Sequence, residues 1–208
     1  PLSDGDPLAM RCGLLSQVLG VDRLECCIGQ QRPAPVQALP GTPPRLVVDD
    51  GFASRASAGE FRFVVGRALA RILTRTLYLD VVQPPTVSLL LAAVASMFER
   101  GYGDYLADGA EVAELTKALG RAVPRKQRKI LEEPARSYAA GQPVNAKAWA
   151  AAAQRSAERA GLLLSGDVEA SLKALRAEKA GRTVQAELLR FAVGPHLYEA
   201  RRRLGLSI

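Results

Sequence analysis

The central helical pattern of this chain reads Ser57-Ala-Gly-Glu-Phe-Arg-Phe-Val-Val-Gly-Arg-Ala-Leu-Ala-Arg-Ile-Leu-Thr-Arg75. Ser57 followed by Glu60 is a capping box, in which the two side chains satisfy free backbone amides at a helix start. The apolar run Phe61–Leu79 then repeats its large side chains at helical spacing. We therefore expect a helix that begins near Ala58 and buries one face.

Three arginines follow one flank of this predicted helix. Arg67, Arg71 and Arg75 recur at every fourth residue, so their side chains should form a row. The row fits a solvated charged edge. It also fits the wall of a cleft that holds an anionic partner or an internal carboxylate, because guanidinium groups pair with carboxylates and phosphates through two parallel bonds. The residues alone leave both interpretations open.

The residues before this helix predict one helix and a small β element. Pro7–Leu19 has apolar residues at helical spacing, and Gly20 is a typical helix stop. Arg23–Ile28 and Pro44–Val48 are rich in apolar and β-branched residues, with several prolines between them. We expect a small, irregular β element that ends at the turn Asp49-Asp50-Gly51.

The rest of the chain predicts helices separated by Gly, Pro and Asn signals. They are expected at about Thr86–Arg100, Gly109–Leu119, Pro124–Ala140, Asn145–Leu164, Asp167–Lys179, Thr183–Val193 and His196–Leu204. The fold class is therefore α+β and mostly α-helical, with a small N-terminal β element followed by a helical bundle. We expect a single domain over 1–208, with a helix and β element in 1–50 and a helical part in 57–208. The first residue is Pro1, which suggests an excised part of a longer protein.

Composition and charge limit the possible partners. The 208 residues are 48% apolar, with a net charge of +7. Apolar stretches such as Val87–Met97 are shorter than the roughly 18 residues of a membrane span. Aromatic residues make up only 5%, whereas nucleic-acid modules usually interleave basic residues with stacking aromatics. The densest basic run, Arg125–Lys129, is expected on a solvated helix where Arg128 pairs with Glu132. We expect no membrane segment and do not favour nucleic acid.

The cysteines and the only histidine predict no catalytic or metal centre. Cys12, Cys26 and Cys27 show no CxxC or CxxH spacing, and adjacent strand residues point to opposite faces. Core positions in a reducing compartment fit them best. His196 is expected in a cap or surface role at the start of the last helix. The basic run Arg201-Arg202-Arg203 suits a helix C-terminus.

Two patches of the chain resemble a metallopeptidase family. Phe61–Arg75 is similar to the active-site helix of gluzincins of the CAAX-prenyl-protease and minigluzincin type, roughly F-x-x-G-H-E-L-G-H. The shared frame consists of Phe61, Gly66 and Leu69. The patch Gln154–Asp167 looks like the later E-x-x-A-D-R-A-G-L-L helix of these enzymes, which supplies their third zinc ligand. The likeness covers about Arg45–Arg176 and implies a minigluzincin-like scaffold.

The departures from the family pattern imply that the chemistry is lost. The H-E-x-x-H positions carry Arg67-Ala68-Leu69-Ala70-Arg71, and the third-ligand position carries Gln154. A guanidinium has no lone pair for zinc, and alanine cannot take a proton from water. Glu158 stands at the position of the family's aspartate and keeps its negative charge. It is expected either to face Arg67 or Arg71 across the former site, or to form an ordinary surface pair.

The resemblance implies a function without catalysis. We expect a pseudopeptidase-type interaction or scaffolding domain in a bacterial cytoplasmic protein, with no cofactor and a protein partner. Arg67, Arg71, Gln154 and Glu158 would mark a fossil site or bind an anionic partner. The patch Gln154–Asp167, together with the tail Phe191–Leu206, also resembles C-terminal regions of large bacterial proteins that begin with tetratricopeptide arrays. A hydrolase that uses another site and a basic nucleic-acid-binding module remain the alternatives.

Overall fold

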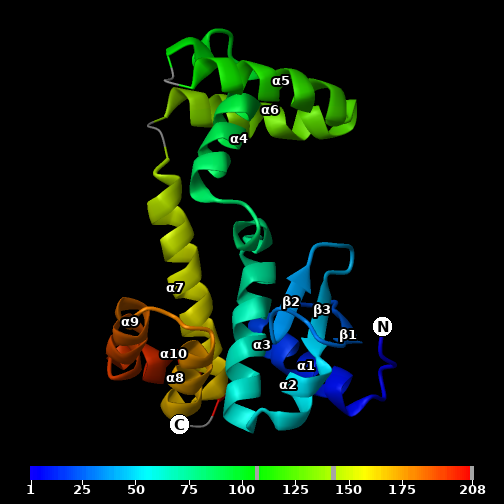
Figure 1. The fold of residues 1–208 in the computed structure, drawn as a ribbon, viewed down its shortest axis with the longest axis vertical. Coiled ribbons are helices and arrows are strands. Elements are labelled where there is room, and N and C mark those ends of the chain that lie inside the picture. Colours follow the sequence, from blue (N-terminus) through cyan, green and yellow to red (C-terminus); the bar gives the residue numbers. More distant parts are fainter. Residues whose placement is uncertain (106–107, 142–143, 207–208) are drawn as a thin grey trace. The chain divides into compact units, whose positions relative to one another are not determined.

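The computed structural model describes residues 1–105, 108–141 and 144–206. It is mostly helical and carries a small three-stranded sheet near its N-terminus (Figure 1), which confirms the predicted fold class. The chain forms two compact units, which we call unit 1 and unit 2. Unit 1 contains Pro1–Tyr78 and Ala152–Ile208, and unit 2 contains Leu79–Ala151. The boundaries of these units differ from the two parts, 1–50 and 57–208, that we expected within a single domain.

Most helices lie within a few residues of the ranges expected from sequence. In unit 1 the elements are α1 Pro7–Leu19, β1 Glu25–Gly29, β2 Val36–Leu39, β3 Arg45–Asp49, α2 Asp50–Arg55, α3 Ala58–Leu73, α8 Val168–Ala177, α9 Arg182–Ala192 and α10 Pro195–Arg203. In unit 2 they are α4 Pro84–Ser96, the 3-10 helix η2 Tyr102–Tyr105, α5 Gly109–Ala122 and α6 Arg125–Ala140. The 3-10 helix η1 Leu77–Asp80 and helix α7 Ala146–Ser165 each contribute residues to both units.

The sheet contains one strand that the proline-rich sequence concealed. Its order is β1-β3-β2, with β1 parallel and β2 antiparallel to β3. Val36 of β2 lies opposite Val48, and Pro35 and Pro40 flank the strand. An edge strand pairs on one side only, so prolines beside it remove few ladder hydrogen bonds. The interval predicted as irregular therefore holds a short edge strand.

Helix α3 begins and ends for identifiable reasons. The Ser57 side chain accepts a hydrogen bond from the Glu60 amide, and the Glu60 carboxylate accepts one from the Ser57 amide, as the capping box predicted. Arg75 has a φ of 56°, and the Thr76 amide donates to the Arg71 carbonyl at 2.9 Å. This left-handed turn closes the helix after Leu73. The expected row of three arginines is wrong at Arg75, which lies beyond the helix.

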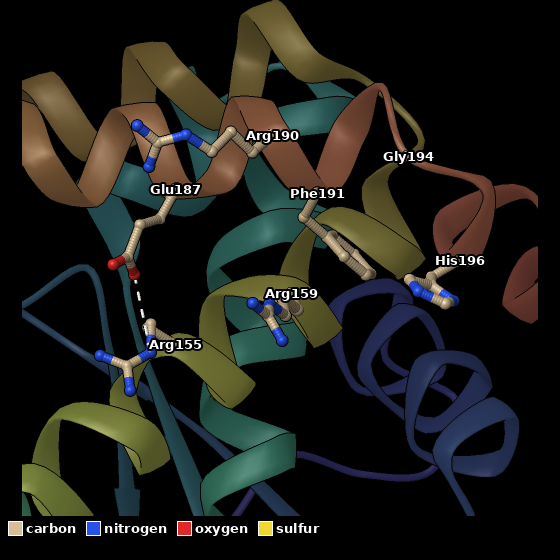
Figure 2. A pocket seen from close by; sticks show the side chains of 7 residues that line it. All are labelled: Arg155, Arg159, Glu187, Arg190, Phe191, Gly194 and His196. Atoms are coloured by element: carbon tan, nitrogen blue, oxygen red, sulfur yellow. Dashed lines mark ion pairs between the residues drawn. The ribbon is translucent and has the colours of Figure 1, made fainter.

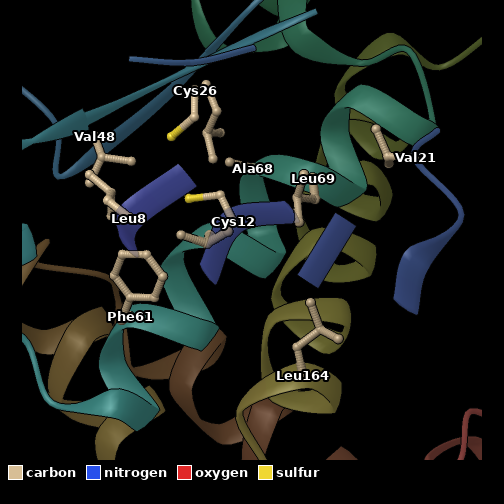
Figure 3. Close-up of a cluster of buried hydrophobic side chains, with 11 residues drawn as sticks. Leu8, Cys12, Val21, Cys26, Val48, Phe61, Ala68, Leu69 and Leu164 are labelled. Atoms are coloured by element: carbon tan, nitrogen blue, oxygen red, sulfur yellow. The ribbon is translucent and has the colours of Figure 1, made fainter. Parts of the chain in front are cut away.

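Two buried clusters meet on α3. Toward the sheet and α1, the fully buried Phe61 and Leu69 pack with Cys12, Cys26 and neighbouring aliphatic residues (Figure 3). On another face, Phe63 packs in a second cluster whose buried members are Val64, Leu162, Ala174, Leu175, Leu188 and Leu197. Because both clusters include α3, this helix is central to unit 1.

The cysteines are core and strand residues, as the sequence suggested. Cys12 and Cys26 are buried, Cys27 on the other face of β1 is half-buried, and all three are free thiols. A hydrogen bond with Cys26, followed by burial, raises the pKa of the Cys12 thiol far above its usual range. A thiol held in its protonated form is a poor nucleophile. The same hydrogen bond lowers the pKa of the Cys26 thiol, and both buried cysteines pack in the core cluster of α1, α3 and the sheet.

Unit 2 is held by α4 and α5, which pack through Ala92, Ala93 and Val112. The predicted pair of Arg128 with Glu132 is wrong. Arg128 instead donates to the Val123 carbonyl at 2.9 Å and to the Gly120 carbonyl. These are among the free carbonyls at the end of α5, where a cation also complements the helix dipole. Within the described ranges, no helix is long and apolar enough to cross a membrane.

Candidate functional site

The two helices that carry the resemblance touch each other. A Cβ atom added to Gly66 of α3 would lie 3.0 Å from the Cα atom of Gly161 on α7, and one added to Gly161 would lie 2.6 Å from the Phe63 carbonyl oxygen. The Ser165 hydroxyl also donates to the Gly59 carbonyl at 3.0 Å. Glycine at both positions lets the two backbones approach closely. The structure therefore places the helices of Arg67 and Glu158 side by side.

Arg67 is neutralised by a carboxylate that the sequence did not suggest. Its Nη1 lies 2.6 Å from Oε2 of Glu178, the residue after α8, and its guanidinium lies 5.4 Å from the centre of the Phe63 ring. The side chains of Arg67 and Glu178 are only 21% and 28% exposed. The direct ion pair of Arg67 is thus with Glu178 rather than with Glu158.

Glu158 is the most buried of the charged residues that we predicted for this site. It is 2% exposed, and its Oε1 accepts a hydrogen bond from Gln154 Nε2 at 3.0 Å. Burial raises the pKa of this carboxyl, and the charges of Glu178 and Glu187 raise it further, while Gln154 and Arg67 act in the opposite direction. Arg67 therefore influences Glu158 through its charge.

Three of the four predicted residues form one polar cluster, which we call the Arg67–Glu158 cluster. Arg67, Gln154 and Glu158 lie in the same region of unit 1, and Arg71 follows one turn later on α3, half-buried and with interactions of its own. Arginine offers no lone pair to a metal, and Ala68 has no base. Across the described part of the chain, no group of three or more His, Cys, Asp or Glu residues is placed to hold a metal ion.

Sequence reasoning missed Glu178 and Glu187. Glu178 is 111 residues from Arg67, and no motif near it marks a site. Glu187, a residue of α9, forms an ion pair with Arg155, whose Nε lies 3.6 Å from Glu187 Oε2. Only the packing of α8 and α9 against α7 brings these carboxylates near Glu158. No local pattern in the sequence could have identified them.

No protein-family model, curated protein or solved structure matches this chain. The relation to gluzincins therefore remains a prediction. What the structure adds is the contact between the two helices and the pairing of the charges that lie there.

A cavity of about 520 Å³ lies beside this cluster, and Glu178 lines it. The wall includes the apolar residues Phe52, Val64, Pro33, Pro35, Ala56, Ala174 and Ala177. It also includes three basic residues, Arg32, Arg55 and Lys173, and three acidic residues, Asp49, Glu60 and Glu178. Lys173 and Glu60 form an ion pair at 3.0 Å. The cavity is therefore amphipathic and close to neutral overall.

Replacing Glu158 by glutamine is expected to change the pH dependence of stability. The folded state raises the pKa of Glu158 above its ordinary value of 4.5, so it holds this proton more tightly than the unfolded chain does. This tighter proton binding adds to the stability of the folded state. The added stability is complete at pH values below the ordinary pKa and is lost as the pH rises through the raised pKa. Glutamine keeps an oxygen for Gln154 but has no such proton.

Urea unfolding at about pH 4.5 and about pH 8 measures this effect. The stability of the wild type relative to Glu158→Gln should decrease at the higher pH. The exposed Glu169→Gln of α8 is the matched control. A difference between wild type and Glu158→Gln that stays constant over this range would contradict the prediction.

Proposed function

We propose that this chain is a non-catalytic, pseudopeptidase-type interaction domain that binds a peptide segment of a partner protein. The observation that carries the proposal is that the polar groups of the Arg67–Glu158 cluster are paired within the protein. Arg67 is satisfied by Glu178, and Glu158 is buried and hydrogen-bonded to Gln154. A general base must reach the proton that it abstracts. A carboxylate that is 2% exposed and already bonded does not meet this requirement.

The amphipathic cavity is the surface that we assign to the partner. Interaction sites of proteins combine buried apolar contacts with charged and polar groups around them. Phe52 and Val64 contribute to the apolar part, and the lining holds three basic and three acidic residues. A nucleic acid would require an excess of basic residues along its backbone. The balanced charge of this cavity favours a peptide that carries both apolar and charged side chains.

The cellular setting belongs to the same proposal. Three free cysteines, two of them buried, favour a reducing compartment such as a bacterial cytoplasm. The resemblance to C-terminal regions of tetratricopeptide proteins suggests that the domain acts beside a repeat array. In that role it would recognise a partner that the array helps to present.

Selection from a random peptide library tests the proposal. Peptides that bind the wild type should lose at least about tenfold in affinity when Arg32→Glu and Arg55→Glu are combined. The acidic side chains of the peptide would then face the two introduced carboxylates at the cavity wall. Arg202→Glu combined with Arg203→Glu is the control, since these exposed arginines lie in α10 outside the cavity. Affinities are measured by fluorescence polarisation, and circular dichroism checks that each variant folds.

Three results would overturn this function. The first is that no peptide is enriched, or that the enriched peptides bind the cavity variant as well as the wild type. The second is one zinc ion per chain, or peptide turnover that a chelator abolishes, which would favour the hydrolase. The third is nucleic-acid binding that weakens steeply with salt and depends on Arg125, Lys126 and Lys129.

A further inference from the structure

A second cavity, of about 650 Å³, lies between α7, α9 and the start of α10. Figure 2 shows three arginines around it, with Phe191 beside Arg159 and His196 at one end. Its residues are Arg155 and Arg159 of α7, Glu187, Arg190 and Phe191 of α9, and Gly194 and His196 at the α9–α10 junction. It is lined by residues other than those of the amphipathic cavity.

The charges that line this cavity do not cancel. Arg155 Nε lies 3.6 Å from Glu187 Oε2, which compensates one of the three guanidinium groups. Glu187 is the only acidic residue in the lining. Among the residues that the structure describes, no carboxylate forms an ion pair with Arg159 or Arg190. Two exposed arginines therefore line the same cavity without a carboxylate partner.

The geometry around Arg159 leaves its donors available. The guanidinium carbon lies 5.3 Å from the centre of the Phe191 ring, so the group is held against an aromatic surface. Contact with a ring uses the charge of the guanidinium, whereas its N–H groups point outward in the guanidinium plane. This arrangement orients the side chain and still lets it bind an oxyanion.

The start of α10 borders the same cavity through Gly194 and His196. Gly194 is the N-cap and provides no side-chain cap, Pro195 has no N–H group, and His196 follows as the second helical residue. The first amides of a helix have no acceptor within the helix, and the positive end of its dipole lies there. Figure 2 shows Arg159 beside Phe191, on the side of the cavity toward this helix start, whereas Arg155 and Arg190 lie on the side of Glu187.

We propose that this cavity binds a phosphate group with about two negative charges, either inorganic phosphate or the phosphomonoester group of a small molecule. Two uncompensated arginines match the two negative charges of such a group, and forked donors match its several oxygens. Phe191 offers an apolar wall to whatever carries the phosphate. This inference is independent of the peptide-binding function, because it concerns a different surface.

The test uses inorganic phosphate and glycerol phosphate as probes, followed by amide NMR at constant ionic strength. Each probe should give saturable shifts at Phe191, Gly194 and His196, with a Kd of about 1 mM or tighter. Arg159→Gln and Arg190→Gln should each weaken binding about tenfold, because each removes a charge-assisted pair. Arg182→Gln, an exposed arginine of α9 outside the lining, should leave the Kd unchanged.

A gain of affinity provides a second and sharper readout. Glu187→Gln removes the only acidic residue of the lining and releases Arg155, so phosphate should bind several-fold more tightly. A merely structural role of these residues would not produce this change. Tighter binding of glycerol phosphate than of inorganic phosphate would support the organic source, and the reverse order would support free phosphate.

Several outcomes would overturn the phosphate site. One is the lack of saturable shifts with either probe. Another is an unchanged Kd in both Arg159→Gln and Arg190→Gln, or weaker binding in Glu187→Gln. Equal binding of chloride or sulfate would show a general anion effect, and preferential binding of a single-stranded polynucleotide would assign the cavity to phosphodiesters. None of these results would affect peptide binding at the amphipathic cavity.

Discussion

Replacing Gly161 by alanine should destabilise unit 1 by about 2 kcal/mol. Alanine gains about 1 kcal/mol over glycine as a helix former, but overpacking a tight contact costs about 1–3 kcal/mol or more. Here the added Cβ would lie 2.6 Å from the Phe63 carbonyl oxygen and 2.9 Å from Arg67 Cγ. The nearest atom belongs to a helix backbone and cannot turn aside. The steric cost is therefore expected to exceed the propensity gain.

Urea unfolding followed by far-UV circular dichroism measures the loss. Gly13→Ala is the matched control, because Gly13 lies within helix α1 and an added Cβ would meet nothing within 4 Å. That substitution should stabilise the protein by about 0.5–1 kcal/mol. If Gly161→Ala is as stable as the wild type, α3 and α7 are not packed as closely as described here.

Replacing Phe63 by alanine should have the larger effect, a loss of about 3–5 kcal/mol. Phe63 is 0% exposed and packs with buried residues of α7, α8 and α9, including Leu162, Leu175 and Leu188. Removing the ring gives up its burial and leaves a cavity that these helices cannot fill without moving. The substitution should also disturb Arg67, whose guanidinium lies over the ring.

Thermal unfolding and urea unfolding of Phe63→Ala both test this expectation. Tyr198→Ala is the control, because Tyr198 is an aromatic residue of the same unit with 55% of its surface exposed. Its replacement should change the free energy of unfolding by no more than about 0.5 kcal/mol. A similarly small change for Phe63→Ala would mean that the second cluster is not the core that joins α3 to the C-terminal helices.

The sequence predicted element boundaries well where a local signal exists. Gly20 ends α1 with a φ of 74°, and the Ser57–Glu60 capping box starts α3. The sequence-based expectation failed where a contact with a neighbouring element replaced the rule for a single helix or strand. Arg128 binds carbonyls of α5 instead of its helical neighbour Glu132, and β2 pairs with β3 inside a proline-rich interval.

The candidate site shows the same division. Residue chemistry was enough to indicate that Arg67, Ala68 and Arg71 provide neither a metal ligand nor a base. The identity of the neutralising carboxylate required the fold, because Glu178 lies 111 residues from Arg67. The cavity of Arg159, Arg190 and His196 likewise forms only where three helices meet.

Helix positions and caps follow from neighbours along the chain, since these depend on periodicity and on what each residue can donate or accept. Which charges meet, which are left without a partner, and where cavities open depend on packing between residues far apart in sequence. Helix propensities and capping hydrogen bonds involve residues only a few positions apart. An ion pair between helices, or a cavity between them, exists only after distant helices have come together. For this protein, local rules established the framework, and long-range packing assembled both surfaces that we assign to ligands.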